Sequence, residues 1–339
     1  ADLALLINEE GDQSPADVFL SQSPGAVGFL DQQGALAPLD ESTLELVDAE
    51  NRASDGNWVG ISGRVRVLVY NTDDVDPADL PDSVLDLTDP AFEGDVAVAP
   101  SNASFQDFVT AMRSALGDDV AEEWLTGMAD NDAPVYANNT AIVEAVGRGE
   151  VPYGLVNHYY NVRAKEEDPS VPSENHTFPD GDIGSLLIVT AASVLESSDR
   201  PDEAEQLIEY LLSEDSQEFY SEETFEYPLA AGVEPADSLA PLDTLSVDTI
   251  DFDELGGGLE RTRRATARPS PRSSRPSRSR TLPPGPAGLH GRRRRSSSSP
   301  SSSAWSSPGP SSTSCGGTSP SVRTCGASSP APRPCGRCS

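Results

Sequence analysis

The sequence predicts an α/β fold with mostly parallel sheets covered by helices on both faces. Apolar runs of strand length alternate along the chain with segments of helical periodicity. Polar turns that read SQSPG, PSNAS and NHYYN follow three of the predicted strands. In open parallel sheets, ligands bind in the crevice beyond the carboxyl ends of the strands, so these turns are where we expect a binding site.

The first elements set this pattern. Residues 2–8 have the periodicity of an amphipathic helix that ends at Gly11. A short strand at 17–20, a polar turn and a helix of small residues follow. The apolar run 65–70 predicts a strand long enough to cross between two lobes.

The same order of strand, turn and helix repeats in the middle of the chain. A strand at 96–99 precedes a turn and a helix at 105–116 with apolar residues at helical spacing. Asn139 stands where the N-cap of the next helix belongs, and Gly147 and Gly149 end that helix.

Two further strands and one helix complete the alternation. The strands are expected at 153–156 and 185–190, and the helix at 201–212. A chain of 339 residues is long enough for two domains.

Charge divides the chain sharply at Glu260. The first 260 residues hold all 56 acidic residues but only 8 of the 23 basic ones, a formal charge of −48, and Lys165 is the only lysine. Such a body repels nucleic acids and anionic membranes. Its partner is therefore a cation or a basic protein surface, although dispersed acidity also keeps proteins soluble at high salt.

The cysteines and the chain start set further bounds. All four cysteines follow residue 260, so the acidic body has neither a disulfide framework nor a thiolate metal site. No apolar run approaches the ~20 residues that span a bilayer. The chain opens within a helical pattern and without a signal peptide, so we expect that an N-terminal part is missing.

The segment 261–339 has a different character from the body. It is composed mostly of Ser, Pro, Arg, Gly, Ala and Thr and lacks Asp, Glu and Lys. This composition predicts a disordered tail. A basic nucleic-acid-binding tail is one interpretation, and a reading-frame shift in a G+C-rich coding sequence is the one we favour.

Two adjacent tyrosines, Tyr159 and Tyr160, follow the strand predicted at 153–156. In a regular strand their side chains would point to opposite faces, whereas at a strand-to-helix turn both hydroxyls can converge. A phenol has a pKa near 10, so a pair of phenols needs a hard, highly charged cation to displace both protons. Ferric ion meets this requirement, and its affinity should fall in acid. Two half-buried aromatics that fix a turn are the alternative.

Three stretches carry a family resemblance. They are SGRVRVLVYNT, SVLDLTDPAFEGDVAVAPSNASFQDFVTAMR and AIVEAVGRGEVPYGLVNHYYNVR, and the later EYPLAAGV adds to them. Together they resemble the ferric-ion substrate-binding proteins of bacterial ABC importers, over about residues 1–260. The resemblance implies a two-lobed, hinged, extracytoplasmic protein, presumed monomeric in this class, that delivers Fe3+ to a membrane permease.

The resemblance also implies a ligand set. Tyr159 and Tyr160 would bind iron, and a synergistic anion, phosphate or carbonate, would complete the coordination. The implied anion-binding residues lie in two turns and at one helix start: Asn102, Ala103, Ser104, Asn139 and Asn157. The sequence agrees for PSNAS, because the free N–H groups at a helix start suit an anion.

The implied lobes divide the chain into four parts. Residues 1–66 would form the first part of lobe 1, 67–181 lobe 2 with the tyrosine pair, and 182–260 the return to lobe 1. The tail 261–339 would replace a short closing helix of the family.

The sequence departs from the family on the lobe 1 side. Some members place an acidic ligand at the turn FLSQS, where this chain has Gln22 followed by Ser23. The family's first strand and helix, with a further contacting side chain, are absent.

Three other side chains near these motifs are candidates for lesser roles. Arg64 and Arg66 alternate on a strand, and we expect structural ion pairs for them in preference to an anion clamp. His158 is expected to donate a hydrogen bond behind the ligands, because hard oxygen donors suit ferric ion better.

Alternative functions remain open. A receptor of the same fold for a polyamine or an oxyanion is one, and a nucleic-acid-binding protein acting through the basic tail is another. The sequence contains no phosphate-binding glycine loop, GxSxG elbow or HExxH motif, so we expect no enzymatic activity.

Overall fold

The computed structural model describes residues 2–242, 245 and 259–266, all within one compact unit. The helices are α1 Asp2–Glu10, α2 Pro24–Gln32, α3 Glu41–Leu44, α4 Ala103–Leu116, α5 Asp118–Asp130, α6 Asn139–Gly147, α7 His158–Glu167, α8 Pro201–Leu211, α9 Glu214–Glu223 and α10 Leu259–Thr266. The strands are β1 Val18–Ser21, β2 Leu36–Ala37, β3 Val59–Asn71, β4 Val96–Ala97, β5 Tyr153–Asn157, β6 Ser173–His176, β7 Leu187–Leu195 and β8 Tyr227–Pro228. Within these residues, no helix combines the length and the apolar character that crossing a bilayer requires.

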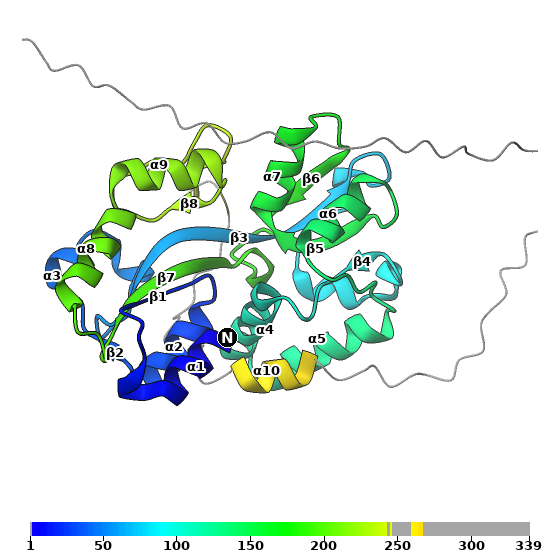
Figure 1. Ribbon diagram of the computed structural model, residues 1–339. Helices are drawn as coiled ribbons and strands as arrows, with labels where there is room; N and C mark the ends of the chain where they lie inside the picture. The colour runs from blue at the N-terminus through cyan, green and yellow to red at the C-terminus, as the bar shows by residue number, and fades with distance from the viewer. Residues whose placement is uncertain (1, 243–244, 246–258, 267–339) are drawn as a thin grey trace, which may run out of the picture. The chain divides into compact units, whose positions relative to one another are not determined.

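Strand β3 organises the sheet (Figure 1). Its first half, Val59–Val65, pairs with β7 and β8, and its second half, from Arg66 to Asn71, pairs with β5 and β6. The strand predicted at 65–70 therefore lies inside a longer strand that serves both groups of partners. The predicted boundary at residue 66 falls at the point where β3 exchanges one group for the other.

The prediction of mostly parallel sheets is wrong. Strands β1, β2, β3, β5, β6, β7 and β8 pair antiparallel, and only β4 and β5 form a parallel pair of strands in the described part of the chain. The alternation of helices and strands identifies the elements but not the direction in which each strand returns. The long strand β3 lies between β7 and β5 and is antiparallel to both.

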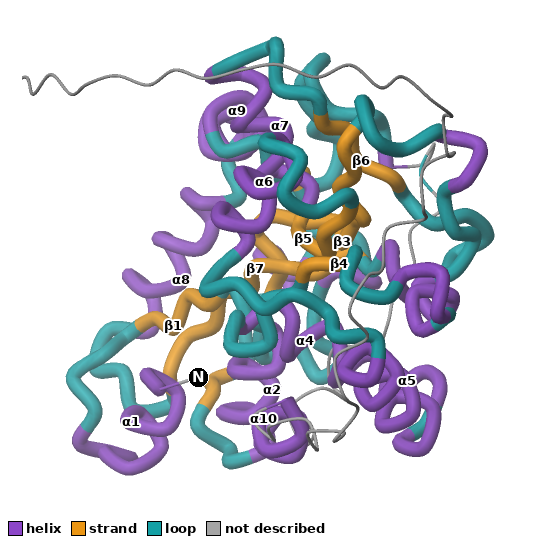
Figure 2. The backbone as a smooth tube through the Cα atoms, turned by 90° about the vertical axis from the view of Figure 1, so that its right-hand side faces the viewer, coloured by secondary structure: helices purple, strands orange, loops and turns teal. Residues whose placement is uncertain are grey.

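Helices cover both faces of the β3–β5 region (Figures 1 and 2). Val67 and Val69 of β3 belong to the cluster that packs against α6. Leu68, between them, faces the opposite way into the cluster that contains Phe105 and Phe108 of α4. This alternation with a period of two residues is what a fully covered strand requires.

Strand β7 is covered in the same way. Ala191 belongs to the cluster that includes the buried face of α2, and Ala192 to the cluster that includes Ile208 of α8. The first of these clusters also contains Leu68 of β3 and Phe108 of α4, so one core cluster reaches from β7 to the second half of β3.

Helix α10 corrects the prediction for residues 261–266, which are helical rather than disordered. The hydroxyl of Thr262 is completely buried, lies 2.8 Å from the Thr110 hydroxyl and accepts a hydrogen bond from Arg113 at 3.1 Å. Arg261 pairs with Asp118 at 2.6 Å. Tertiary packing against α4 and α5 thus holds a segment whose composition alone predicts disorder. The remainder of the predicted tail, from residue 267, lies outside the described residues.

A close contact between β5 and α6 yields a stability prediction. A Cβ added at Gly154 would lie 2.2 Å from Cγ2 of Ile142 and 3.3 Å from Cγ1 of Val69. Gly154→Ala should therefore lower the free energy of unfolding by about 1–3 kcal/mol through overpacking, measured by urea denaturation. In an Ile142→Ala background the same substitution should cost clearly less, because the clashing methyl group is gone. Equal costs in both backgrounds would contradict this packing.

Candidate ferric-ion site

The tyrosine pair stands at the junction of β5 and α7. Helix α7 begins at His158 directly after β5, so Tyr159 and Tyr160 lie in its first turn. Their rings stack with centroids 4.1 Å apart and planes inclined by 28°. Tyr160 lies close enough to Tyr159 to raise its pKa. The two rings therefore lie face to face in the first turn of α7.

Burial controls the protonation of this pair. Tyr159 is only 6% exposed, and Tyr160 is partly buried. Burial raises the pKa of Tyr159 well above its ordinary value, and the hydrogen bond with Tyr160 raises it further, while the nearby Arg64 acts in the opposite direction. At neutral pH the Tyr159 phenol therefore keeps its proton, and only a ligand with high positive charge can remove it.

His158 is held by both ring nitrogens. Nδ1 accepts a hydrogen bond from the backbone N–H of Val65 at 3.1 Å, and Nε2 lies 2.8 Å from the carbonyl oxygen of Phe225, to which it donates. Burial lowers the pKa of His158 to about 4, so the ring is neutral. In this arrangement His158 fixes the start of α7 against β3 and presents no free nitrogen to a metal.

The turn before α4 forms a polar cradle. The Asn102 side chain caps the helix, accepting hydrogen bonds from the backbone N–H of Ser104 at 2.9 Å and from its hydroxyl at 2.6 Å. Ala103, the first helical residue, is exposed. The free N–H groups of this helix start are suited to an anion.

Arg66 joins this cradle to the tyrosine strand. Its Nη1 lies 3.3 Å from Oδ1 of Asn157 and 3.5 Å from Oγ of Ser104, and its Nη2 donates to the carbonyl of Leu155 at 2.9 Å. The side chain is completely buried, and its Nε has no hydrogen-bond partner. Burial lowers the pKa of Arg66 to about 9, against the influence of Tyr160.

The expectation of structural ion pairs for Arg64 and Arg66 is wrong. Neither guanidinium lies within 4.0 Å of a carboxylate in the described part of the chain. Both are at least 98% buried, so a charge in this position calls for an anion. Sequence reasoning undervalued them, although two arginines inside an otherwise apolar strand pattern are a visible signal.

Asn139 is not the N-cap of α6. That role belongs to Asn138, whose Oδ1 accepts from the backbone N–H of Ala141 at 2.9 Å. Asn139 lies inside the helix and is completely buried, and neither polar atom of its amide has a hydrogen-bond partner among the residues that the structure describes. Such a group is costly unless a ligand or solvent completes it.

The turn at Gln22 and Ser23 is held in part by Asp107, a residue that the sequence analysis did not single out. Gln22 is exposed, and its carbonyl accepts a hydrogen bond from Arg64. Ser23 is buried, and its hydroxyl donates to Oδ1 of Asp107 at 2.8 Å. Burial raises the pKa of Asp107 to about 7. The signal for Asp107 in the sequence is that it is an acidic residue on the apolar face of a predicted helix.

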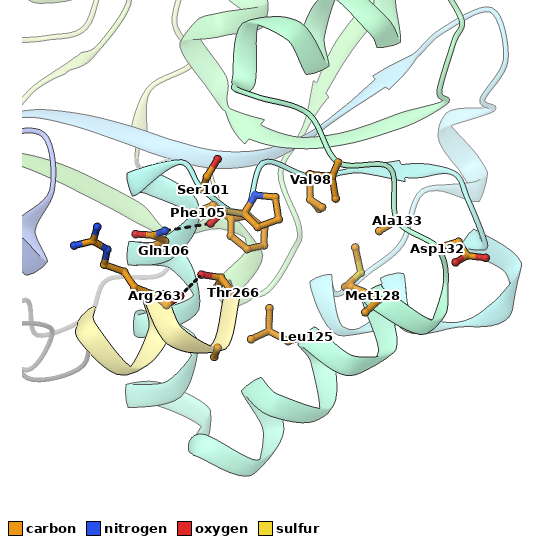
Figure 3. Close-up of a pocket in the computed structure, with 14 residues that line it drawn as sticks. Val98, Ser101, Phe105, Gln106, Leu125, Met128, Asp132, Ala133, Arg263 and Thr266 are labelled. Atoms are coloured by element: carbon orange, nitrogen blue, oxygen red, sulfur yellow. Dashed lines mark hydrogen bonds between the residues drawn. The ribbon is translucent and has the colours of Figure 1, made fainter. Parts of the chain in front are cut away.

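A separate hollow of about 780 Å3 lies between α4, α5 and α10 (Figure 3). Its walls are largely apolar and include Val98, Phe105, Leu125 and Met128. None of the predicted site residues lines it. Within the described residues there is also no group of three or more His, Cys, Asp or Glu side chains arranged to hold a metal.

Comparison with known proteins defines the class. Residues 13–255 match the model of the bacterial extracellular solute-binding proteins, and the chain belongs to this family. It is 34% identical over 250 residues to the Fe(3+)-binding periplasmic protein of Serratia marcescens, covering 73% of this chain and 74% of that protein. The family resemblance inferred from the motifs is thereby confirmed.

Solved structures agree with this assignment. Iron-bound HitA from Pseudomonas aeruginosa matches with a TM-score of 0.74 and 36% identity, covering 78% of this chain and 87% of that one. FutA from Trichodesmium, in complex with iron and citrate, matches with a TM-score of 0.70 and 29% identity over 78% and 86% of the two chains. The two-lobed α/β periplasmic-binding-protein fold is thus confirmed.

The environment of His158 yields a pH prediction. The unfolded imidazole takes up a proton near pH 6.5, whereas the folded one stays neutral down to about pH 4, so stability is complete above pH 6.5 and is lost as the pH falls. The contribution amounts to about 3 kcal/mol between these limits. Asp107 acts oppositely, because its raised pKa removes stability as the pH rises from about 4 to 7.

The variant His158→Gln separates the contribution of His158 to the pH dependence of stability from that of Asp107. The difference in unfolding free energy between the wild type and His158→Gln should grow from pH 4 to pH 6.5 and then stay level, as measured by urea denaturation at a series of pH values. A difference that does not change with pH would mean that the imidazole already titrates normally in the folded protein.

Proposed function

We propose that this protein captures Fe3+ outside the cytoplasm and delivers it to the permease of an ABC importer, without catalysing a reaction. Tyr159 and Tyr160 bind the ion as phenolates, and a synergistic anion completes its coordination. The observation that carries the proposal is the stacked pair of phenols beside two buried arginines, neither of which has a carboxylate within 4.0 Å among the described residues. The names of relatives such as the Serratia protein and HitA support the choice of iron.

The sum of the charges at the proposed site supports the assignment of Fe3+ bound together with a divalent anion. Ferric ion with two phenolates retains one positive charge, and a divalent anion reverses it to one negative charge. Arg66, whose guanidinium acts electrostatically on Tyr160, can balance that charge. A buried site stays favourable only when its charges are compensated in this way.

The anion is assigned to the cradle around Arg66. The helix start at Asn102, Ala103 and Ser104, the amide of Asn157 and the unpartnered amide of Asn139 provide its donors. Phosphate and carbonate both fit this chemistry, and the citrate in the Trichodesmium structure belongs to the same class of oxyanions.

Closure of two lobes around the ion is the mechanism that this fold offers. We assign residues 1–66 and 182–260 to lobe 1 and residues 67–181 to lobe 2, with Gln22 and Ser23 on the lobe 1 side. The protein works as a monomer in this scheme. A receptor of the same fold for another oxyanion would use the same arginines but would leave the stacked tyrosine pair without a role, and a polyamine receptor would not need buried arginines.

Removal of either phenol tests the iron assignment. Tyr159→Phe and Tyr160→Phe should each weaken ferric binding by about 100-fold or more, because one anionic ligand is lost, and should abolish or shift the visible phenolate-to-iron absorption. The measurement is titration of the full chain with ferric nitrilotriacetate, followed by absorbance. Tyr210→Phe, an exposed tyrosine on α8, is the matched control. Iron loading by both variants at the level of the wild type would refute the site.

Neighbouring asparagines of α6 test the anion assignment. Asn139→Ala should reduce ferric affinity in phosphate by about tenfold and leave stability nearly unchanged, because the amide makes no hydrogen bond within the protein. Asn138→Ala should show the reverse pattern, with about 1 kcal/mol of stability lost and affinity retained, because it removes only the cap. Titration and urea denaturation of both variants give the comparison. Equal affinity for the two variants would exclude Asn139 from the anion cradle.

A further inference from the structure

The turn at the end of β1 is held from several directions. The Ser21 hydroxyl donates to the carbonyl of Ser23 at 3.0 Å and accepts from its N–H at 3.1 Å. The Ser23 hydroxyl donates to Asp107, which lies 84 residues further along the chain. Arg64 donates to the carbonyl of Gln22, the residue between them. The backbone of a three-residue turn is therefore fixed, while the Gln22 side chain remains exposed.

Asp107 lies one helical turn after Ser104 of the anion cradle. Both residues are on the buried face of α4, with Asp107 1% and Ser104 7% exposed. The intervening turn is closed by backbone hydrogen bonds, starting with Gln106 N–H to the carbonyl of Asn102 at 3.1 Å. A helix turn of this kind keeps the spacing between its ends nearly constant. Any shift of the helix start therefore moves Asp107 with it.

The buried carboxylate has no other visible use. Its Oδ2 has no hydrogen-bond partner, and the cation that acts on it, Arg64, is the same residue that holds Gln22. A buried acid that serves packing alone would be replaced at a gain in stability by an apolar residue. The Asp107 carboxyl group instead fixes the position of the Ser21–Ser23 turn.

We propose that Asp107 is a positioning residue that couples the anion cradle at the start of α4 to the Gln22 turn through its bond with Ser23. Occupation of the cradle by the anion fixes α4, and α4 then holds the turn where it meets the bound ion from the lobe 1 side. Asp107 itself touches neither the ion nor the anion. This inference rests on the proposed ferric-binding function.

The test compares the effect of the anion on iron affinity among four variants of the full chain. Ferric nitrilotriacetate is titrated in phosphate and in phosphate-free buffer, and the ratio of the two affinities measures the coupling. Ser23→Ala and Asp107→Ala, which remove the bond, should lower this ratio by about tenfold. Asp107→Asn should retain it, because the amide oxygen can still accept from Ser23. Thr110→Val, which removes another buried hydrogen bond one turn further along α4, should leave the ratio unchanged.

The outcomes separate the two levels of the argument. Loss of stability in Ser23→Ala and Asp107→Ala with an unchanged ratio would overturn the coupling and leave the iron site intact. A wild-type protein that binds ferric ion without any phenolate absorption would overturn the proposed function and the coupling with it. A ratio that falls equally in Thr110→Val would also overturn the proposal, because the effect would then report helix stability alone.

Discussion

The structure depends on two buried positive charges in the middle of its longest strand. Arg64 and Arg66 stand where β3 exchanges β7 for β5. Both are at least 98% buried, and no carboxylate of the described residues lies within ion-pair distance of either. Backbone carbonyls and the Asn157 amide satisfy part of each guanidinium, but they do not neutralise it. Arg66 also lies over the rings of Phe105 and Phe108. A bound anion would stabilise such buried charges further, and the paired tyrosines and a helix start are among the groups that act on them.

This constraint explains why chain segments far apart in sequence meet at β3. The turn after β1 reaches Arg64, the start of α4 reaches Arg66, and the start of α7 brings the tyrosines. Each contributes neutral donors or acidic protons rather than a fixed negative charge. Two acidic residues of the described chain do lie close to these groups: Asp107, which Arg64 acts on, and Glu226, which acts on Tyr159.

The sequence allows the parts of this arrangement to be predicted where the signal is local. The adjacent tyrosines after an apolar strand and the helix start at PSNAS are of this kind, and both were placed correctly. The antiparallel pairing of β3 could not be predicted, because it follows from contacts between segments that lie about 90 residues or more apart. Asn139 was predicted to be the N-cap of α6, whereas it is the first helical residue and Asn138 is the N-cap. Two adjacent asparagines compete for the cap position. Helix α10 was missed since packing on α4, rather than composition, stabilises it.

The raised pKa of Tyr159 also has a consequence for selectivity. Burial makes removal of the phenolic proton unfavourable by the same amount for every cation. A divalent ion recovers less of that free energy than a trivalent one, because its attraction to each phenolate is weaker. Hard anionic oxygen donors add a preference against softer metals. If Tyr159 binds the ion as proposed, the two effects together favour ferric ion more strongly than a ready-made carboxylate would at the same position.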